Sequence, residues 1–386
     1  MSRRASLTIL FVIVFVDLLG FGMVIPVLPL YAKRLGASEA WTGLLSSGYS
    51  AMQFVFAPVW GRLSDRVGRR PVLLASIAMT AVAFAMYGFA TDFAWLLAAR
   101  LFAGVATANI AIAQAYVADV TSPENRAKGM GLIGAAFGLG FVLGPFFGGV
   151  LSQWGLAAPS FAAAALSAVN GLVAYVVLGE PGHRGVAPAR AHGLSALRGE
   201  LSRRGIRRLL LIYFMTLLAF SAMETTYAFL ANERYGISAE HVFYVFAYIG
   251  LLVTIVQGGL VGPMTRRFGE RRLLVLGLAL QAVSLALLTV ASGLTGLLVA
   301  TAPLAIGNGF SSPATTSLLS RMSREDDQGG TLGIGQSAAA FGRILGPETG
   351  TFTFSRISPG FPYLGGAALM AAAALIGVTL RTRDGP

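Results

Sequence analysis

Five ionisable side chains interrupt long apolar stretches of this chain: Asp17, Arg100, Glu224, Arg343 and Glu348. A charged side chain at the centre of a membrane helix costs about 2.5–3.5 kcal/mol on insertion scales, so each of these positions suggests a functional site. A carboxyl group in such a place suits reversible protonation, because burial away from water favours its neutral form. These residue types indicate proton movement.

Asp17 and Arg100 form the first candidate pair. Asp17 lies near the middle of the first apolar stretch, and Arg100 lies about a third of the way along the fourth. Because an arginine side chain can cover a few ångströms of depth, an ion pair or a water-bridged link between the two is expected. The alternative is a neutralised pair that only packs two helices together.

Glu224 has no basic residue within its own apolar stretch, which suits a carboxyl group that gains and loses a proton. The alternative is a glutamate in a hydrated vestibule.

Arg343 and Glu348 are five residues apart, which is not the spacing of three or four that favours a pair within one helix. They are expected to contact other helices, in a functional or a structural role. The predicted proton-coupling set is Asp17, Glu224 and Arg100, with Glu348 in reserve.

Other chemistry finds little support in the sequence. The string 128–134 contains the spacing G-x-G-x-x-G, but it opens an apolar stretch and lacks the strand that a dinucleotide site requires. Cysteine is absent, and the three histidines lie in the predicted loops. No metal site, cofactor or enzymatic activity is expected.

The composition is that of a membrane protein. Of 386 residues 55% are hydrophobic and 12% are charged, and the mean hydropathy is +0.70. A soluble protein carries about a quarter charged residues. The net charge is +12, and 23 of the 29 Lys and Arg residues fall in loops on one predicted side of the membrane. This distribution is typical of cytoplasmic loops and argues against a nucleic-acid-binding site.

Twelve apolar stretches are each close to the roughly 20 residues that cross a bilayer. They lie at about 7–30, 41–60, 71–90, 94–118, 127–152, 158–178, 209–232, 242–265, 272–291, 295–319, 330–354 and 361–380. The predicted domains are an N-terminal six-helix bundle (1–179), a cytoplasmic linker (180–206) and a C-terminal six-helix bundle (207–386). Both termini are predicted to be cytoplasmic, in the inner membrane of the cell.

The two halves share landmarks. Gly61–Pro71 and 262–272 repeat a glycine and arginine spacing at an offset of 201, and Gly144-Pro145 matches Gly346-Pro347 at an offset of 202. Two six-helix halves of like topology are typical of secondary transporters. Chance similarity between glycine-rich helices is the alternative.

These stretches also resemble a known family. Gly61–Arg70 resembles the loop signature of the major facilitator superfamily, and 100–104 resembles its fourth-helix motif. The stretch 138–149 resembles the fifth-helix motif of its drug–proton antiporters, and 17–29 resembles the first helix of the tetracycline-efflux branch. The resemblance implies an all-α membrane protein with twelve transmembrane helices in two six-helix repeats, working by alternating access.

The resemblance also implies a gate. Asp65 would accept hydrogen bonds at the N-terminus of the eleventh span, near 329–331, and Arg69 would pair with Asp119. The full predicted gating set is Gly61, Asp65, Arg66, Gly68, Arg69, Arg70, Asp119, Gly144 and Pro145.

A central cavity is implied in the same way, lined by spans one, two, four, five, seven, eight, ten and eleven. Amide and aromatic side chains there suit an amphipathic organic molecule. The predicted substrate-binding set is Gln53, Asn109, Gln114, Tyr227, Gln257, Asn308, Gln336, Phe137 and Arg343. Two acids and a histidine of the tetracycline branch are replaced here by Ala83, Gln281 and Val253, which weakens the case for a metal–tetracycline substrate.

The sequence therefore predicts a proton-coupled exporter of small amphipathic organic compounds. Its expected partners are a small-molecule substrate, protons and the lipid bilayer, without nucleic acid, and it is expected to be a monomer. A proton symporter or uniporter of a nutrient or metabolite is one alternative. A membrane receptor or scaffold that transports nothing is an alternative of another class.

Overall fold

The computed structural model describes residues 3–107, 109–120, 123–180, 203–237, 239–323 and 328–380, which form helices and short connections without any strand. Most of the predicted linker and the basic tail at 381–383 lie outside these ranges. Seven of the described helices are long and apolar enough to cross a membrane by length and composition. Two shorter apolar helices, Phe93–Ala106 and Gly138–Ser152, accompany them.

The chain forms two compact units. Unit 1 consists of Met1–Ser38, Leu44–Ala189 and Ser238–Gly250, and unit 2 consists of Glu39–Gly43, Arg190–Ile237 and Leu251–Pro386. This clustering does not test the predicted domain boundaries, which stay a prediction.

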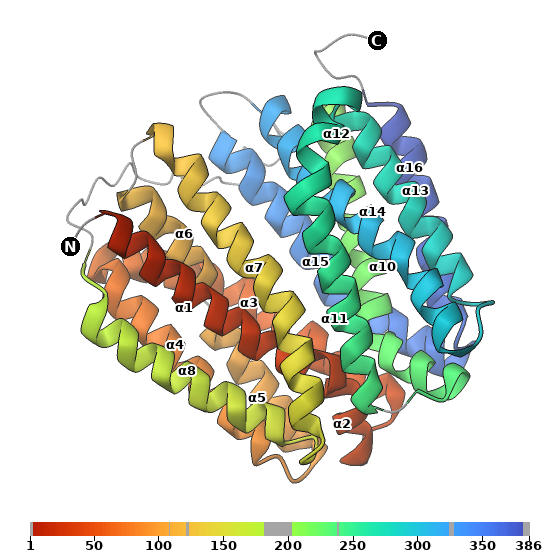
Figure 1. The fold of residues 1–386 in the computed structure, drawn as a ribbon, viewed down its shortest axis with the longest axis horizontal. Coiled ribbons are helices and arrows are strands. Elements are labelled where there is room, and N and C mark those ends of the chain that lie inside the picture. Colours follow the sequence, from red (N-terminus) through yellow and green to blue (C-terminus); the bar gives the residue numbers. More distant parts are fainter. Residues whose placement is uncertain are drawn as a thin grey trace. The chain divides into compact units, whose positions relative to one another are not determined.

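The helices of the first half are coloured red to yellow-green in Figure 1. They are α1 (Arg3–Val24), the 3₁₀ turn η1 (Ile25–Val27), α2 (Leu28–Arg34), α3 (Glu39–Val67), α4 (Arg69–Gly88), α5 (Phe93–Ala106), α6 (Asn109–Val120), α7 (Pro123–Ser152) and α8 (Ala158–Val177). Within unit 1, α1 packs against α7 and α8, and α4 lies beside α8 (Figure 1).

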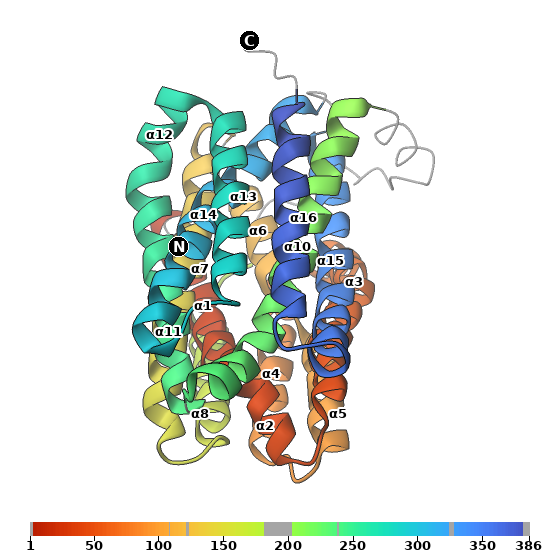
Figure 2. The ribbon, with the colours of Figure 1, turned by 90° about the vertical axis from the view of Figure 1, so that its right-hand side faces the viewer.

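The second half begins at α10. Its elements are α10 (Arg204–Tyr235), α11 (Ala239–Ile255), the π-helical turn η2 (Val256–Leu260), α12 (Val261–Phe268), α13 (Glu270–Leu287), α14 (Gly293–Met322), α15 (Gln328–Arg356) and α16 (Phe361–Val378). Within unit 2, α10 packs against α15 and α16, and α10 and α16 run side by side in Figure 2.

Two of the predicted spans change helical form for local reasons. In the first span, Pro26 lies in the 3₁₀ turn between α1 and α2, because proline cannot supply the N–H that would continue α1. In the eighth span, a π-helical turn contains Gln257 and two glycines. Such turns are rare and are frequently found at functional sites.

The repeated glycine turn precedes the third predicted span of each half, which is α4 in the first half and α13 in the second. Gly68 precedes α4 with φ 115°, and Gly269 precedes α13 with φ 79°. Residues with a side chain rarely adopt these angles, so glycine is required at both positions. Gly61 differs from this expectation, because it is an interior residue of α3 and the described residues leave the space beside its Cα open.

Glycines also set the closest helix contacts. A Cβ built on Gly144 in α7 would lie 2.7 Å from the Cα of Gly22 and 2.8 Å from the carbonyl oxygen of Leu19, both in α1. At the matching place in unit 2, a Cβ on Gly346 in α15 would lie 2.6 Å from the carbonyl oxygen of Leu218 in α10. Small residues at such crossings let backbones approach closely in membrane proteins.

This packing predicts unequal effects of two glycine substitutions. Gly144→Ala should lower the unfolding temperature, because backbone atoms block the added methyl group and overpacking typically costs about 1–3 kcal/mol. Gly365→Ala is the matched control in α16, since the added Cβ meets nothing within 4 Å and alanine is the better helix former. Thermal unfolding of both variants in one detergent is the measurement. Equal decreases would contradict the packing explanation.

Candidate functional site

The first predicted proton site is a hydrogen-bonded pair between α1 and α6. Asn109 is fully buried, and its Nδ2 donates to Oδ1 of the half-buried Asp17 at 2.8 Å. Oδ1 of Asn109 is buried and has no hydrogen-bond partner within the described part of the chain. The carboxylate is therefore held by an amide that still has one unused acceptor.

Asn109 reaches Asp17 because the fourth span is broken. We expected one helix over 94–118, but α5 ends at Ala106 and Thr107 has ψ 85°. The carbonyl oxygen of Ala106 accepts from Ser76 Oγ at 2.5 Å, and that of the neighbouring Val105 accepts from Trp60 Nε1 at 2.6 Å. Side chains from α3 and α4 thus satisfy carbonyls at the end of α5, which would otherwise be left without a donor.

Arg100 is enclosed by uncharged groups. Its side chain is buried, Nε donates to the carbonyl oxygen of Leu45 at 2.9 Å, and Nη1 donates to the hydroxyl of Tyr87 at 3.5 Å. The guanidinium carbon lies 4.1 Å from the ring centroid of Tyr49 and 5.7 Å from that of Phe21. Contacts between a cation and aromatic faces partly offset the loss of hydration.

The direct Asp17–Arg100 ion pair that we expected is not formed among the residues that the structure describes. Asp17 is bound by Asn109 instead, and Arg100 is held by backbone and aromatic groups. The two sites are connected through neighbours, because Tyr49 lies against Arg100 and its hydroxyl is 2.9 Å from Oγ1 of Thr107 at the helix break.

The amides predicted to bind substrate differ in exposure. Gln53 and Asn308 are half-buried, whereas Gln114, Gln257 and Gln336 are exposed. The predicted Phe137 lies in α7, but its side chain is outside the described residues. Substrate contact by these residues stays a prediction.

Tyr227 is fully enclosed within unit 2, and its hydroxyl is 2.8 Å from Oγ1 of Thr301. Glu224, Glu348 and Arg343 are half-buried in the same unit, and both glutamates have interaction partners. The roles assigned to these four residues in binding or proton coupling stay predictions.

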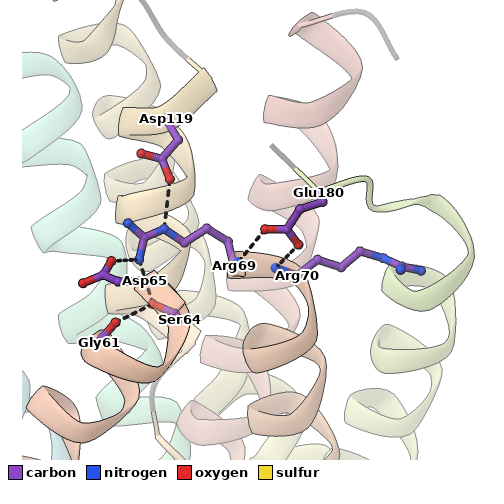
Figure 3. Close-up of polar contacts among 7 residues, drawn as sticks. All are labelled: Gly61, Ser64, Asp65, Arg69, Arg70, Asp119 and Glu180. Atoms are coloured by element: carbon purple, nitrogen blue, oxygen red, sulfur yellow. Dashed lines mark hydrogen bonds and ion pairs between the residues drawn. The ribbon is translucent and has the colours of Figure 1, made fainter. Parts of the chain in front are cut away.

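The repeated turn of unit 1 carries a network of charged groups, shown in Figure 3. Nε of Arg69 donates to Oδ2 of Asp119 at 2.9 Å, which confirms the predicted pair. Nη1 of Arg69 lies 2.5 Å from Oδ1 of Asp65 and 2.7 Å from Oγ of Ser64. Arg69 thereby connects the end of α3 with the end of α6. The predicted hydrogen bonds between Asp65 and the start of the eleventh span, and the gating role of the exposed Arg66, stay predictions.

Sequence reasoning missed one acid of this network. Glu180 follows α8, and its two carboxylate oxygens accept the backbone N–H groups of Arg69 at 2.7 Å and of Arg70 at 3.0 Å (Figure 3). Arg70 also donates from Nη2 to the carbonyl oxygen of Tyr175 at 2.7 Å. Glu180 was overlooked because it is the first residue of the predicted polar linker, where acidic residues are common and suggest no specific role. Its place directly after an apolar span, with the arginine-rich turn at that same end, was the available signal.

Thr107 and Tyr87 were missed for another reason. Both are single polar residues within apolar stretches, where packing is the usual role. Their partners come from other helices and are not visible in the sequence. Within the described ranges, no three His, Asp or Glu side chains come together as a metal site would require.

Comparison with known proteins places this architecture in a family. The family model of the Major Facilitator Superfamily matches residues 10–262 and 258–386. The class C tetracycline resistance protein of Escherichia coli is 34% identical over 379 residues, covering 96% of this chain and 95% of that protein. Multidrug resistance protein 2 of Bacillus subtilis (strain 168) is 27% identical over 373 residues, which cover 94% of this chain and 92% of that protein.

Solved structures agree with this placement. The human organic anion transporter MFSD10 (TETRAN) superposes with a TM-score of 0.74 at 26% identity, covering 98% of this chain and all of that one. The nucleoside transporter NupG shares the fold alone, with a TM-score of 0.82 at 14% identity. The chain therefore belongs to the Major Facilitator Superfamily, as a multi-pass membrane transporter with the twelve-helix, two-repeat fold and not an enzyme.

Proposed function

We propose that this transporter exports small amphipathic organic compounds in exchange for protons. Similarity over most of the chain to proteins named for tetracycline and multidrug resistance supports export of such compounds. Import of a nutrient by proton symport or uniport is the alternative. The observation that carries proton exchange is the hydrogen bond between Asp17 and Asn109, which lies between two helices and is partly buried.

This pair can serve both protonation states of the carboxyl group. As a carboxylate, Asp17 accepts from Nδ2 of Asn109. As a carboxylic acid it has a proton to donate, and Oδ1 of Asn109 is buried nearby without a partner in the described residues. An amide carries both a donor and an acceptor, so rotation of the Asn109 side chain satisfies either state. Proton uptake at Asp17 thereby changes the contact between α1 and α6.

A coupling site of this kind must also link proton affinity to conformation. Asn109 begins α6 directly after the helix break, and Thr107 at the break contacts Tyr49 of α3. Discontinuous helices are typical of coupling and substrate sites in secondary transporters. Protonation of Asp17 therefore acts, through Asn109, on the helix break at Thr107, where the fourth span has fewer helical hydrogen bonds.

Asp17→Asn should abolish proton-driven export, because an amide cannot exchange a proton, while downhill movement of substrate continues. The assay is uptake of a fluorescent substrate into everted vesicles or proteoliposomes under an imposed pH gradient. Asp92→Asn is the matched control, since Asp92 caps α5 by accepting from the N–H of Trp95 and asparagine is an equally good cap. Uphill transport that survives in Asp17→Asn would refute proton coupling at this site.

A second candidate substrate class is organic anions. Every partner of Arg100 within the described part of the chain is uncharged, so its buried positive charge is not neutralised by an acid there and favours an anion nearby. The MFSD10 structure at 26% identity is titled as that of an organic anion transporter. Anionic and cationic dyes of similar size, compared in the same vesicles, separate this candidate from export of neutral or cationic compounds.

The Arg69–Asp119 pair supports a gating role for the repeated turn, because it connects α4 with α6 at one end of unit 1. Arg69→Gln and Asp119→Asn should each slow transport. The double variant should be no slower than Arg69→Gln alone, since groups in direct contact are not additive. The initial rates of the four proteins form the cycle. Simple additivity would remove the pair from the gate.

The orientation in the membrane gives a separate test. Arg266 and Arg356 are both exposed, and the chain contains no cysteine. If basic loops are cytoplasmic, Arg356→Cys should react with an impermeant thiol reagent in intact cells. Arg266→Cys should react only after the membrane is opened or everted. The reverse pattern would invert the proposed topology and the direction of transport.

A further inference from the structure

Both halves join the start of their third span to the end of their fourth span, but with opposite charges. In unit 1, Arg69 is the first residue of α4, and it pairs with Asp119, the next-to-last residue of α6. In unit 2, Glu270 is the first residue of α13, and it accepts from Ser317 at 2.5 Å. Oε2 of Glu270 also lies 3.5 Å from Arg321, the next-to-last residue of α14.

The two ion pairs differ in how they suit the helices that carry them. The N-terminus of a helix favours an anion and the C-terminus favours a cation. Glu270 and Arg321 follow this rule at both ends of their contact. Arg69 and Asp119 oppose it at both ends, because a cation begins α4 and an anion ends α6. The unit 2 ion pair therefore places an anion at the start of its helix, whereas the unit 1 ion pair requires another residue to do so.

Glu180 supplies an anion to the first backbone N–H groups of α4, whereas Asp65 at the end of α3 binds the side chain of Arg69. Gly68 occupies the capping position there and has no side chain to cap with. The carboxylate of Glu180 takes its place, with one oxygen on the backbone N–H of Arg69 and the other on that of Arg70. Hydrogen bonds from a charged acceptor to the first N–H groups are the contacts that a helix N-terminus lacks.

The segment that carries Glu180 is fixed on both sides. The hydroxyl of Tyr116 in α6 donates to the carbonyl oxygen of Gly179 at 2.6 Å. Arg70 donates to the carbonyl oxygen of Tyr175, and its guanidinium lies 5.4 Å from the ring centroid of the same residue. The residues just before Glu180 are thus held by a contact with α6 and by a contact between α4 and α8, which keeps the carboxylate against the start of α4.

We propose that Glu180 is a positioning residue for the transport cycle: it caps α4 and thereby holds Arg69 on Asp119. This inference rests on the proposed function, in which that ion pair is part of the gate. Unit 2 has Glu270 at the corresponding place, so loss of Glu180 should weaken the unit 1 contact alone.

Two glycines offer a matched pair of variants. Gly68 and Gly269 both have positive φ, so alanine strains the backbone at either position. A Cβ on Gly68 would also lie 2.7 Å from Oε1 of Glu180, whereas a Cβ on Gly269 meets nothing within 4 Å. Because a carboxylate at the end of a flexible side chain moves easily, Gly68→Ala should displace the cap. Gly269→Ala keeps the strain without that displacement.

The cap is tested by hydrogen exchange of the full-length protein in lipid nanodiscs. Glu180→Gln should speed exchange of the Arg69 and Arg70 amides by about tenfold, the loss expected for a hydrogen bond to a charged group. Glu180→Asp keeps the charge on a shorter side chain and should give an intermediate effect. Exchange of the amides that start α13 should not change. This readout needs no transport, so it stands even if proton-coupled export proves wrong.

Positioning is tested by combining Glu180→Gln with Asp119→Asn. The initial transport rate should fall in each single variant, and the double variant should be no slower than the slower single one. Gly68→Ala should behave like Glu180→Gln in both assays. Gly269→Ala should speed exchange of the amides that start α13 less than Gly68→Ala speeds exchange at Arg69 and Arg70.

Unchanged amide exchange in Glu180→Gln would overturn the cap. Faster exchange together with additive transport losses would leave a cap that does not position the ion pair, which also overturns the proposal. An equal increase in exchange at the amides that follow each substituted glycine, at the start of α4 in Gly68→Ala and at the start of α13 in Gly269→Ala, would do the same, because backbone strain alone would then explain the effect.

Discussion

A polar group inside a bilayer must find its partner within the protein, because the hydrocarbon offers none. The fourth span shows how far this constraint determines the site. The helix can break at Thr107 only because Trp60 and Ser76 supply donors to the carbonyls at the end of α5. The break then allows a new helix to begin at Asn109, whose amide binds Asp17. The proposed proton site thus depends on two side chains that do not contact Asp17.

The same constraint explains how Arg100 is buried without an acid. Its guanidinium has a carbonyl oxygen and a tyrosine hydroxyl as acceptors, and aromatic rings lie against it. An ion pair with Asp17 would have neutralised both groups and left neither free to respond. Because Asp17 and Arg100 have separate partners, both lie in unit 1 and the charge of Asp17 can change without breaking a direct contact with Arg100. This arrangement suits the proposed site, where one group exchanges protons while the charge of the other is not neutralised.

The sequence predicted features that depend on local spacing. Gly68 and Gly269 indicated paired turns, and both have the positive φ that only glycine tolerates readily. The Arg69–Asp119 contact was also predicted, although through family resemblance rather than through the residues themselves. The break at Thr107 and the neutral surroundings of Arg100 could not be predicted, because their partners come from other helices. Tyr227 illustrates the same limit, since its helix was identified but not the face that packs against Thr301.

Internal duplication of a fold does not require duplication of its interactions. Both halves must fix the start of one helix to the end of another, and either order of charges achieves this. Glu270 and Arg321 suit the dipoles of the two helices that they join, so the unit 2 contact already has an anion at the start of α13. Arg69 and Asp119 oppose the helix dipoles, and although Arg69 also binds Asp65 and Ser64 of α3, the first N–H groups of α4 are capped by Glu180. The proposed gate contact of unit 1 therefore depends on a third group from beyond α8. An ion pair that needs a third group can be released by moving that group, which is the property a gate requires.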